Sequence, residues 1–291
     1  MAARLLEGKP VAEAVLTKVS EKIKGMTECG VTPGLGTILV GDNEASGGYV
    51  RKKHETCQQV GIVSFNVEIP VDATQPDLLA AIDRLNQNPN VDGFLIQHPL
   101  PPGFDFNEAL MRMDPAKDAD GLHPVNLGKL VLQENGPLPC TPAGIRAMLN
   151  YYEVPLEGRN VVIVGRGPTL GRPLSLLLTL KQGANAAVTV VHSGVVDLER
   201  YTRKADIVVA AVGVPGFIKP EMIKPGAAVV SGGISWKGRT LLADVDESVG
   251  EVAGWITPRL GGVGPTTVAM LMQNTVQAAK YRLAKKTEST M

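Results

Sequence analysis

Cysteine is scarce in this sequence, with three residues in a chain of 291, at positions 29, 57 and 140. They are scattered, and none forms a Cys-x-x-Cys pair, so a disulfide framework is excluded and a reducing compartment is indicated. The four histidines are equally isolated and have no metal-ligand spacing with one another or with the cysteines. We therefore expect no metal site.

Long apolar runs are also missing. No stretch approaches the roughly 20 apolar residues that span a bilayer, and the first residues, MAARLLEGKPVAEAV, contain no uninterrupted apolar signal segment. Neither charge sign is in excess, because 29 Lys and Arg balance 29 Asp and Glu. Without a global positive field, nucleic acid is not an expected partner. We expect a cytoplasmic protein that binds neither nucleic acid nor membrane.

The composition is that of an ordinary globular protein, with 44% hydrophobic and 20% charged residues, and the length suits two domains. The first half alternates helical and strand patterns, which predicts a mainly parallel sheet in a three-layer α/β domain. The expected elements are a helix from Pro10 to about Cys29, a strand at 34–41, a helix through Tyr49 and Lys53, a strand at 63–70, a helix at 76–88 and a strand at 91–99.

The second half shows a still clearer pattern. A helix is expected after 139–142, ending near Tyr152, and four short apolar runs follow at 160–165, 186–192, 206–213 and 227–233. Such runs, separated by polar helical segments, are typical of a doubly wound Rossmann sheet. A last helix, from about Val268 to Leu283, is expected to pack back on the first domain. The predicted domains are 1–139, completed by 268–291, and 140–267.

A glycine-rich turn, Gly165-Arg166-Gly167-Pro168-Thr169-Leu170-Gly171, joins the predicted strand at 160–165 to an apolar helix. Glycines let the backbone turn tightly and approach a pyrophosphate, and the N–H groups at a helix N-terminus bind anions. A turn of this kind is often structural, but within a βαβαβ pattern it favours a dinucleotide site.

The end of the next predicted strand indicates which dinucleotide binds. An acidic residue there would hold the ribose 2′-hydroxyl of NAD, but the strand ends Val191-His192-Ser193-Gly194. Arg166 adds a cation suited to a 2′-phosphate, so NADP is favoured over NAD. The alternative is that Arg166 and Ser193 are only solvated turn residues.

Tyr49 and Lys53 have the i, i+4 spacing that places two side chains on one helix face. A tyrosine ring can stack on a flat heterocycle, and a desolvated lysine beside it can act as a base. By spacing alone, a solvated basic run at 51–54 is the stronger interpretation. Gln97, after a buried strand, and Asp120, in a turn, are less explicit still.

Six segments in this order resemble the bifunctional methylenetetrahydrofolate dehydrogenase/cyclohydrolase family over nearly the whole chain. KDADG with PCTP, followed by the glycine turn and GGVGP, is a combination known from no other family. The segments are ASGGYVRKK at 45–53, IQHPLP at 96–101, PAKDADGLHPVNLGKL at 115–130, PCTPAGI at 139–145, GRGPTLGRP at 165–173 and GGVGPTT at 261–267.

The resemblance implies oxidation of 5,10-methylenetetrahydrofolate by NADP, hydrolysis of the product to 10-formyltetrahydrofolate, and a homodimer formed through the cofactor domain. Tyr49 would stack on the folate, Lys53 would be the catalytic lysine oriented by Gln97, and Asp120 would hold the pterin. The other implied folate residues are Ser46, Gly261, Gly264, Pro265 and Thr267. The implied dinucleotide residues are Thr141, Gly165, Arg166, Gly167, Gly171, Ser193 and Ile234, with Arg166 and Ser193 nearest the 2′-phosphate.

Several positions depart from the family's usual pattern. Gly167 replaces a serine, Ser231 replaces an aspartate, His98 replaces a leucine, and the proline-rich loop before Gly261 contains Arg259 and Leu260. Two alternatives stay open. One is another two-domain dehydrogenase, of the shikimate or amino-acid type, which has no use for the first-half residues. The other is a non-catalytic dinucleotide-binding paralogue, which the altered loops suggest and a turnover assay tests.

Overall fold

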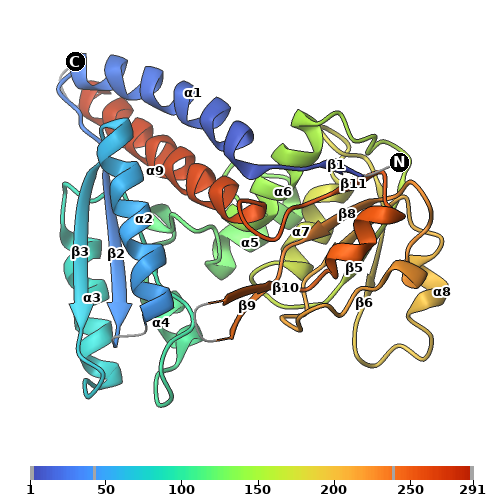
Figure 1. The fold of residues 1–291 in the computed structure, drawn as a ribbon. Coiled ribbons are helices and arrows are strands. Elements are labelled where there is room, and N and C mark those ends of the chain that lie inside the picture. The colour runs from blue at the N-terminus through green and yellow to red at the C-terminus, as the bar shows by residue number, and fades with distance from the viewer. Residues whose placement is uncertain (1–2, 42–43, 238–239, 289–291) are drawn as a thin grey trace. The chain divides into compact units, whose positions relative to one another are not determined.

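The computed structural model describes residues 3–41, 44–237 and 240–288. The chain divides into two compact units (Figure 1). Unit 1 contains Met1–Glu13 and Pro139–Thr267, and unit 2 contains Ala14–Leu138 and Val268–Met291. Helices α1 (Gly8–Glu28) and α9 (Val263–Glu288) each begin in unit 1 and continue into unit 2. No described helix is long and apolar enough to cross a membrane.

The sheet of unit 2 has three parallel strands in the order β3-β2-β4. These strands are β2 (Gly34–Val40), β3 (Val63–Ile69) and β4 (Gly93–Ile96). All seven residues of β2 are buried, as expected for a central strand covered on both faces. The sheet places the residues that follow β2 and β4 at one edge, because parallel strands share the same direction.

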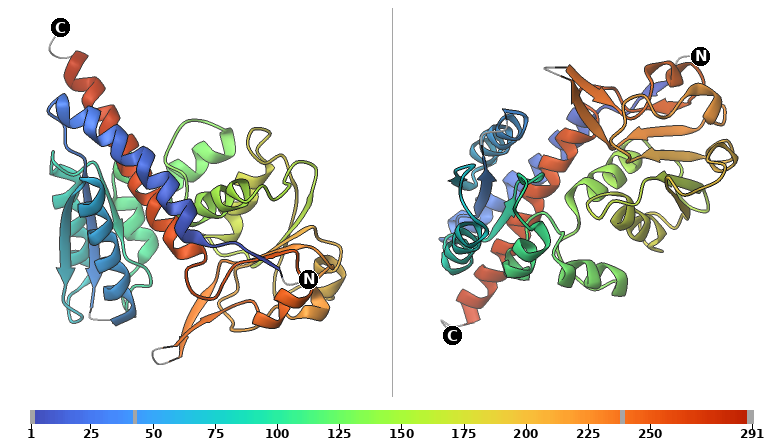
Figure 2. Two further views of the ribbon diagram at one scale, coloured as in Figure 1. Left: turned by 45° about the horizontal axis from the view of Figure 1, so that its top comes forward. Right: turned by 90° about the horizontal axis from the view of Figure 1, so that it is seen from below.

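Helices pack on this sheet through apolar faces. Leu78, Ile82 and Leu85 of α3 (Gln75–Gln87) pack with Ile38 and Phe94 of the sheet in one buried cluster. The unit-2 segments of α1 and α9 lie side by side in Figure 1 and in the left view of Figure 2. The remaining helical elements of unit 2 are α2 (Glu44–Val60), α4 (Phe106–Arg112), the short η1 (Pro115–Lys117) and α5 (Pro124–Leu132).

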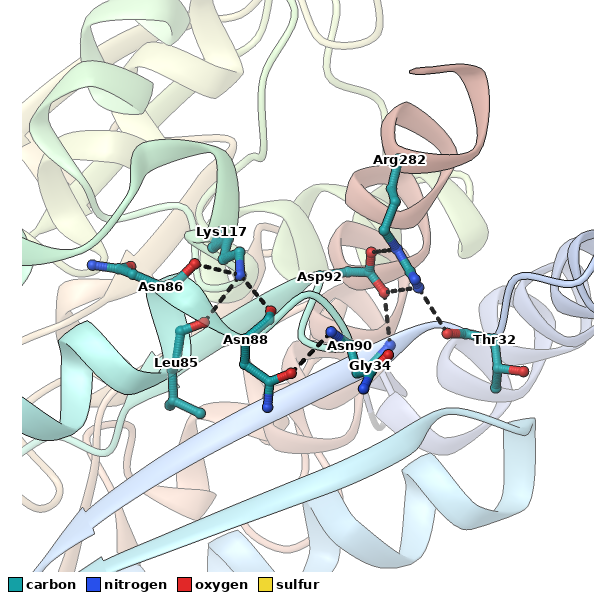
Figure 3. A network of polar contacts seen from close by, with 9 residues as sticks. All are labelled: Thr32, Gly34, Leu85, Asn86, Asn88, Asn90, Asp92, Lys117 and Arg282. Atoms are coloured by element: carbon teal, nitrogen blue, oxygen red, sulfur yellow. Dashed lines mark hydrogen bonds and ion pairs between the residues drawn. The ribbon is translucent and has the colours of Figure 1, made fainter. Parts of the chain in front are cut away.

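Two cationic side chains of unit 2, those of Lys117 and Arg282, each form several hydrogen bonds with other segments of the unit (Figure 3). Lys117 donates from Nζ to the carbonyl oxygens of Leu85, Asn86 and Asn88 at 3.0, 2.7 and 2.8 Å, which caps the C-terminus of α3. Arg282 of α9 donates from Nε and Nη2 to the two carboxylate oxygens of Asp92 at 2.6 and 2.9 Å. Both contacts join segments that are distant in the sequence.

Unit 1 contains a six-stranded parallel sheet in the order β1-β11-β8-β7-β5-β6. Residues of β5 alternate between two buried clusters, with Val161 and Ile163 in one and Val162 and Val164 in the other. Both faces of the sheet are therefore covered, as in a doubly wound fold. The strands are β1 (Arg4–Leu5), β5 (Asn160–Val164), β6 (Ala187–Val191), β7 (Ile207–Ala210), β8 (Ala228–Ser231) and β11 (Trp255–Ile256).

The chain order of these strands creates a switch point. After β5 the chain forms β6 on one side, and it then crosses to form β7 on the other side. Ligands of doubly wound proteins bind outside the carboxyl ends of the strands at such a point. The other elements of unit 1 are α6 (Cys140–Tyr151), α7 (Gly171–Thr179), α8 (Glu199–Thr202), η2 (Pro220–Met222), η3 (Glu247–Glu251) and the antiparallel hairpin of β9 (Ile234–Lys237) and β10 (Thr240–Ala243).

The predicted fold class is confirmed, but two helix starts were placed too late. Helix α6 begins at Cys140, within the PCTP segment, and α9 begins at Val263, before Val268. Pro142 and Pro265 lie in the first turns of these helices, where a missing N–H breaks no hydrogen bond of the helix. Strands β1 and β11 were not predicted, because two-residue strands leave no detectable period. The β9–β10 hairpin, with four residues in each strand, was not predicted either.

Candidate functional site

Three of the predicted catalytic residues lie together in unit 2. Helix α2 places Tyr49 and Lys53 one turn apart, and the Lys53 ammonium nitrogen lies 4.9 Å from the centre of the Tyr49 ring. The same nitrogen donates to Gln97 Oε1 at 2.9 Å, although the side chains are 44 residues apart in sequence. Lys53 is only 5% exposed, so it does not belong to a solvated basic face. The alternative interpretation of the basic run is wrong at this position.

The amide of Gln97 has a fixed orientation. Its backbone N–H donates to Ile38 O at 2.8 Å, which continues the pairing of β4 with β2 by one residue. Its side-chain Nε2 donates to His98 O at 2.8 Å, so Oε1 is the atom that faces Lys53. The amide therefore presents an acceptor to the lysine, and one of its two N–H donors is used by His98 O.

A buried carboxylate shapes the turn that carries Asp120. Asp118 is 3% exposed and accepts hydrogen bonds from Gly121 N at 2.9 Å, His123 N at 2.8 Å and Asn126 Nδ2 at 2.9 Å. Asp120 itself is partly exposed. Sequence reasoning missed Asp118, although the alternation of aspartates in KDADG offered a signal: one side chain folds inward to fix the turn and the other is presented outward.

His98 and Asp120 interact electrostatically. Partial burial lowers the pKa of His98 below its ordinary value, and the Asp120 carboxylate opposes this shift. The His98 ring also meets the Phe106 ring edge-on, with 4.9 Å between centroids. A neutral imidazole therefore stands next to Gln97 at neutral pH, where the family usually has leucine.

The glycine turn of unit 1 is tightly folded. Gly165 has a φ of +122°, and a Cβ there would lie 2.2 Å from Ala211 O. A Cβ on Gly171 would lie 2.2 Å from Gly165 O, so glycine is required at both positions. A Cβ on Gly167 would have no atom within 4 Å, so its backbone faces open space. The turn thus fits a pyrophosphate close to its backbone.

Arg166 and Ser193 lie at the same edge of the sheet. They follow β5 and β6, which are adjacent, with Val164 paired to Val191. Both side chains are exposed. A guanidinium group and a hydroxyl at this edge, with no carboxylate at the end of β6, suit a 2′-phosphate better than a free ribose hydroxyl.

The remaining predicted residues of unit 1 are partly brought together. Thr267 donates from Oγ1 to Thr141 Oγ1 at 3.2 Å, and Gly264 and Pro265 occupy the first turn of α9. Gly261 has a φ of +75° and no atom near a Cβ. The side chains of Ile234 in this unit and of Ser46 in unit 2 lie outside the described residues.

The altered loop before Gly261 is held by hydrogen bonds. Arg259 donates from Nε to Glu247 Oε1 at 3.0 Å and from Nη1 to Leu241 O at 2.8 Å, while Leu260 is 61% exposed. Within residues 3–41, 44–237 and 240–288, no three His, Cys, Asp or Glu side chains gather as metal ligands.

Comparisons with known proteins cover both units. Residues 6–120 match the catalytic-domain model of tetrahydrofolate dehydrogenase/cyclohydrolase, and residues 139–283 match its NAD(P)-binding domain. The bifunctional protein FolD of Syntrophotalea carbinolica is 70% identical over 283 residues, which is 97% of this chain and 98% of the relative.

Solved structures agree with this match. The bifunctional methylenetetrahydrofolate dehydrogenase/cyclohydrolase of Campylobacter jejuni has a TM-score of 0.91 and 40% identity, covering 97% of this chain and 100% of the other. The Trypanosoma brucei enzyme, solved with NADP cofactor and an inhibitor, has a TM-score of 0.91 and 37% identity, covering 97% of this chain and 99% of the other.

Proposed function

This chain belongs to the tetrahydrofolate dehydrogenase/cyclohydrolase family, which has an NAD(P)-binding domain and includes the bifunctional FolD proteins, and we propose that Lys53 carries its hydrolytic step. The chain oxidises 5,10-methylenetetrahydrofolate with NADP and hydrolyses the 5,10-methenyl product to 10-formyltetrahydrofolate. The matches to both halves favour this activity over another two-domain dehydrogenase. The observation that carries the residue assignment is the buried Lys53 amine between Gln97 and Tyr49.

Within this proposal, residues 1–139 with 268–291 form the folate-binding domain, and 140–267 form the dinucleotide-binding domain. Tyr49 stacks on the flat ring system of the folate, because an aromatic face offers dispersion contact to a heterocycle. Asp120, presented by the turn that Asp118 fixes, accepts hydrogen bonds from the pterin. Ser46, Gly261, Gly264, Pro265 and Thr267 complete the folate contacts.

The oxidation depends on placement. NADP, when bound, supplies the acceptor for the hydride that leaves the methylene carbon of the folate. The neighbouring folate nitrogens stabilise the resulting cation, so the protein needs no strong base at this step. Holding the folate by Tyr49 and Asp120 in the reactive orientation is the contribution of this chain.

The hydrolysis requires proton transfer. Water attacks the methenyl carbon and loses one proton, which gives a hydroxyl-bearing intermediate. The carbon–N5 bond then breaks as the formyl C=O forms, and the remaining hydroxyl proton passes to N5. Burial penalises a charged ammonium group, which makes the Lys53 amine suited to accept the proton or relay it. Gln97 Oε1, fixed by the bond from Nε2 to His98 O, holds the amine in place.

The cofactor preference is tested by Arg166→Ala. We expect the KM for NADP to rise about 10- to 100-fold, because one charge-assisted hydrogen bond to the 2′-phosphate is lost. The KM for NAD should stay within about twofold, since NAD has no such phosphate. The assay follows absorbance of the methenyl-folate product after 5,10-methylenetetrahydrofolate is mixed with protein and either cofactor.

Arg200→Ala, an exposed arginine of α8 in the same unit, is the matched control and should leave both constants unchanged. An equal rise in KM for both cofactors after Arg166→Ala would contradict the 2′-phosphate assignment. Absence of turnover in the unchanged protein with either cofactor would favour the non-catalytic alternative.

We also propose a cytoplasmic homodimer that associates through the dinucleotide-binding domain. Balanced charge and three free cysteines support the cytoplasmic location, and the resemblance to the family is the ground for the dimer. Sedimentation equilibrium should give twice the chain mass of 30.8 kDa, and a single-chain mass at micromolar concentration would refute the dimer.

A further inference from the structure

Asp244, at the end of the β9–β10 hairpin, is a fully buried carboxylate that no folate or dinucleotide assignment uses. Its exposed fraction is 0%. Oδ2 accepts hydrogen bonds from Val212 N at 2.8 Å and Gly213 N at 2.9 Å. Both donors belong to the loop that follows β7, so a residue more than 30 positions away determines the path of this loop.

This loop lies against the glycine turn. Ala211 N donates to Val164 O at 2.8 Å, and Ala211 O is the atom that a Cβ on Gly165 would meet. The strands β5 and β7 are adjacent and flank the switch point of the sheet. The loop held by Asp244 therefore forms one wall of the place where a doubly wound sheet binds its nucleotide.

The carboxylate also supports the turn after β8. Gly232 N and Gly233 N both donate to Ala210 O, at 2.8 and 3.1 Å. A Cβ on Gly233 would lie 2.0 Å from Asp244 Oδ2, so the Gly233 backbone rests directly on the carboxylate. The hydroxyl of Ser231 accepts from Asp244 N at 3.0 Å and donates to Gly233 O at 3.1 Å. Asp244 thus joins two loops at the carboxyl edge.

Keeping this carboxylate buried is unfavourable for folding. Burial raises the pKa of Asp244, and the backbone bonds from Gly213, Val212 and Val214 lower it only in part. Its Oδ1 is buried and has no hydrogen-bond partner among the described residues. An acceptor in this state is costly. Such costs are typical of positions where a precise local geometry serves binding.

We propose that Asp244 is a positioning residue for the dinucleotide. Its carboxylate holds the loop of Ala211–Gly213 against the glycine turn, so that the backbone at this edge is already arranged when NADP arrives. This inference rests on the proposed placement of NADP at the glycine turn. Pre-arranged backbone lowers the ordering cost of binding.

The test compares Asp244→Ala, Asp244→Asn and the control Asp246→Asn. Asp246 lies two residues further on, where its partly exposed carboxylate pairs with Lys219 at 2.6 Å and caps η3 by accepting from Ser248 N, which asparagine can also do. Dissociation constants for NADPH are measured by fluorescence titration, and hydrogen exchange is measured for residues 211–216. The KM for 5,10-methylenetetrahydrofolate is measured at saturating NADP.

Asp244→Ala should weaken NADPH binding about tenfold or more and speed exchange at 211–216, while the KM for the folate stays within about twofold. Asp244→Asn retains one acceptor oxygen and should recover part of the affinity. Asp246→Asn should leave all three measurements unchanged. Gly233→Ala displaces the carboxylate without removing it, and should reproduce the loss if Asp244→Ala fails to fold.

Unchanged NADPH affinity with faster exchange at 211–216 would overturn the proposal, because the loop would then be independent of the cofactor. Equal losses of NADPH affinity, folate affinity and exchange protection throughout the chain would also overturn it, by indicating a purely structural residue. Failure of the unchanged protein to bind NADPH would instead contradict the placement of the cofactor itself.

Discussion

Lys53→Met is expected to lose the hydrolysis of 5,10-methenyltetrahydrofolate by a factor of about 10² to 10⁴, the usual contribution of a general acid or base. Methionine is one atom shorter than lysine but is equally unbranched and fills most of the same buried space, so the loss reports mainly on the amine rather than on packing. The oxidation of 5,10-methylenetetrahydrofolate should fall much less, because that step takes no proton from the folate. The measurement follows decay of the methenyl absorbance beyond its spontaneous rate.

Lys52→Met is the matched control. Lys52 is the preceding residue of α2, and its exposed amine pairs only with Glu55, at 3.3 Å, among the contacts observed for it. Both activities should persist in this variant. Hydrolysis at the normal rate in Lys53→Met would refute the assignment, and an equal loss in Lys52→Met would attribute the effect to the charge of the helix instead.

Gln97→Glu tests whether hydrolysis depends on the protonation of Lys53 or only on where its amine is held. It preserves an acceptor for Lys53 but adds a negative charge, which holds a proton on the amine. A lysine that must accept a proton should then work only at higher pH. The pH profile of hydrolysis is therefore expected to move upward in this variant, and an unmoved profile would indicate that Gln97 acts only in binding.

Much of this cluster could be predicted from the sequence because helical spacing is local. An i, i+4 interval places Tyr49 and Lys53 on one face in any regular helix. Their burial was not predictable from spacing, since the basic run at 51–54 also fits a solvated face. The resemblance to a known family supplied what local pattern lacked, and the Lys53–Gln97 hydrogen bond agrees with it.

The residues that hold the loops were not predictable in the same way. Asp118 and Asp244 accept hydrogen bonds from backbone N–H groups of other residues. Nearly every residue has such a group, so the sequence does not indicate which of them will donate to these carboxylates. The Rossmann strands were found because each is a continuous apolar run. The short strands β1 and β11 were missed because their pairing depends on a sheet formed by residues more than 200 positions apart.

Arg282→Ala is expected to lower the free energy of unfolding by about 2 to 3 kcal/mol, because it leaves the Asp92 carboxylate buried without its cation. The Asp92 side chain is 1% exposed, and Arg282 also donates to Thr32 O at 2.9 Å. This expected loss of unfolding free energy is smaller than the usual cost of breaking a buried ion pair, because the Arg282 side chain is 34% exposed. Urea unfolding followed by circular dichroism measures the change.

Arg112→Ala provides the matched comparison within the same unit. Arg112 also forms two bonds with one aspartate, at 2.7 Å each to Asp83, but both side chains lie at the surface. Solvent screens such a pair, so its loss should lower the free energy of unfolding only slightly, and by much less than Arg282→Ala does. The two ion pairs have nearly the same hydrogen-bond geometry, so the two variants differ mainly in whether the remaining carboxylate is buried.

A second substitution identifies the cause. Asp92→Asn removes the buried charge but keeps an oxygen that can accept from Gly34 N, which now donates to Asp92 at 2.9 Å. The double variant with Asp92→Asn and Arg282→Ala should be more stable than the Arg282→Ala variant, because it contains no unpaired buried charge. If the double variant is instead less stable, by the sum of the two single losses, the stabilisation comes from packing of α9 and not from the buried ion pair.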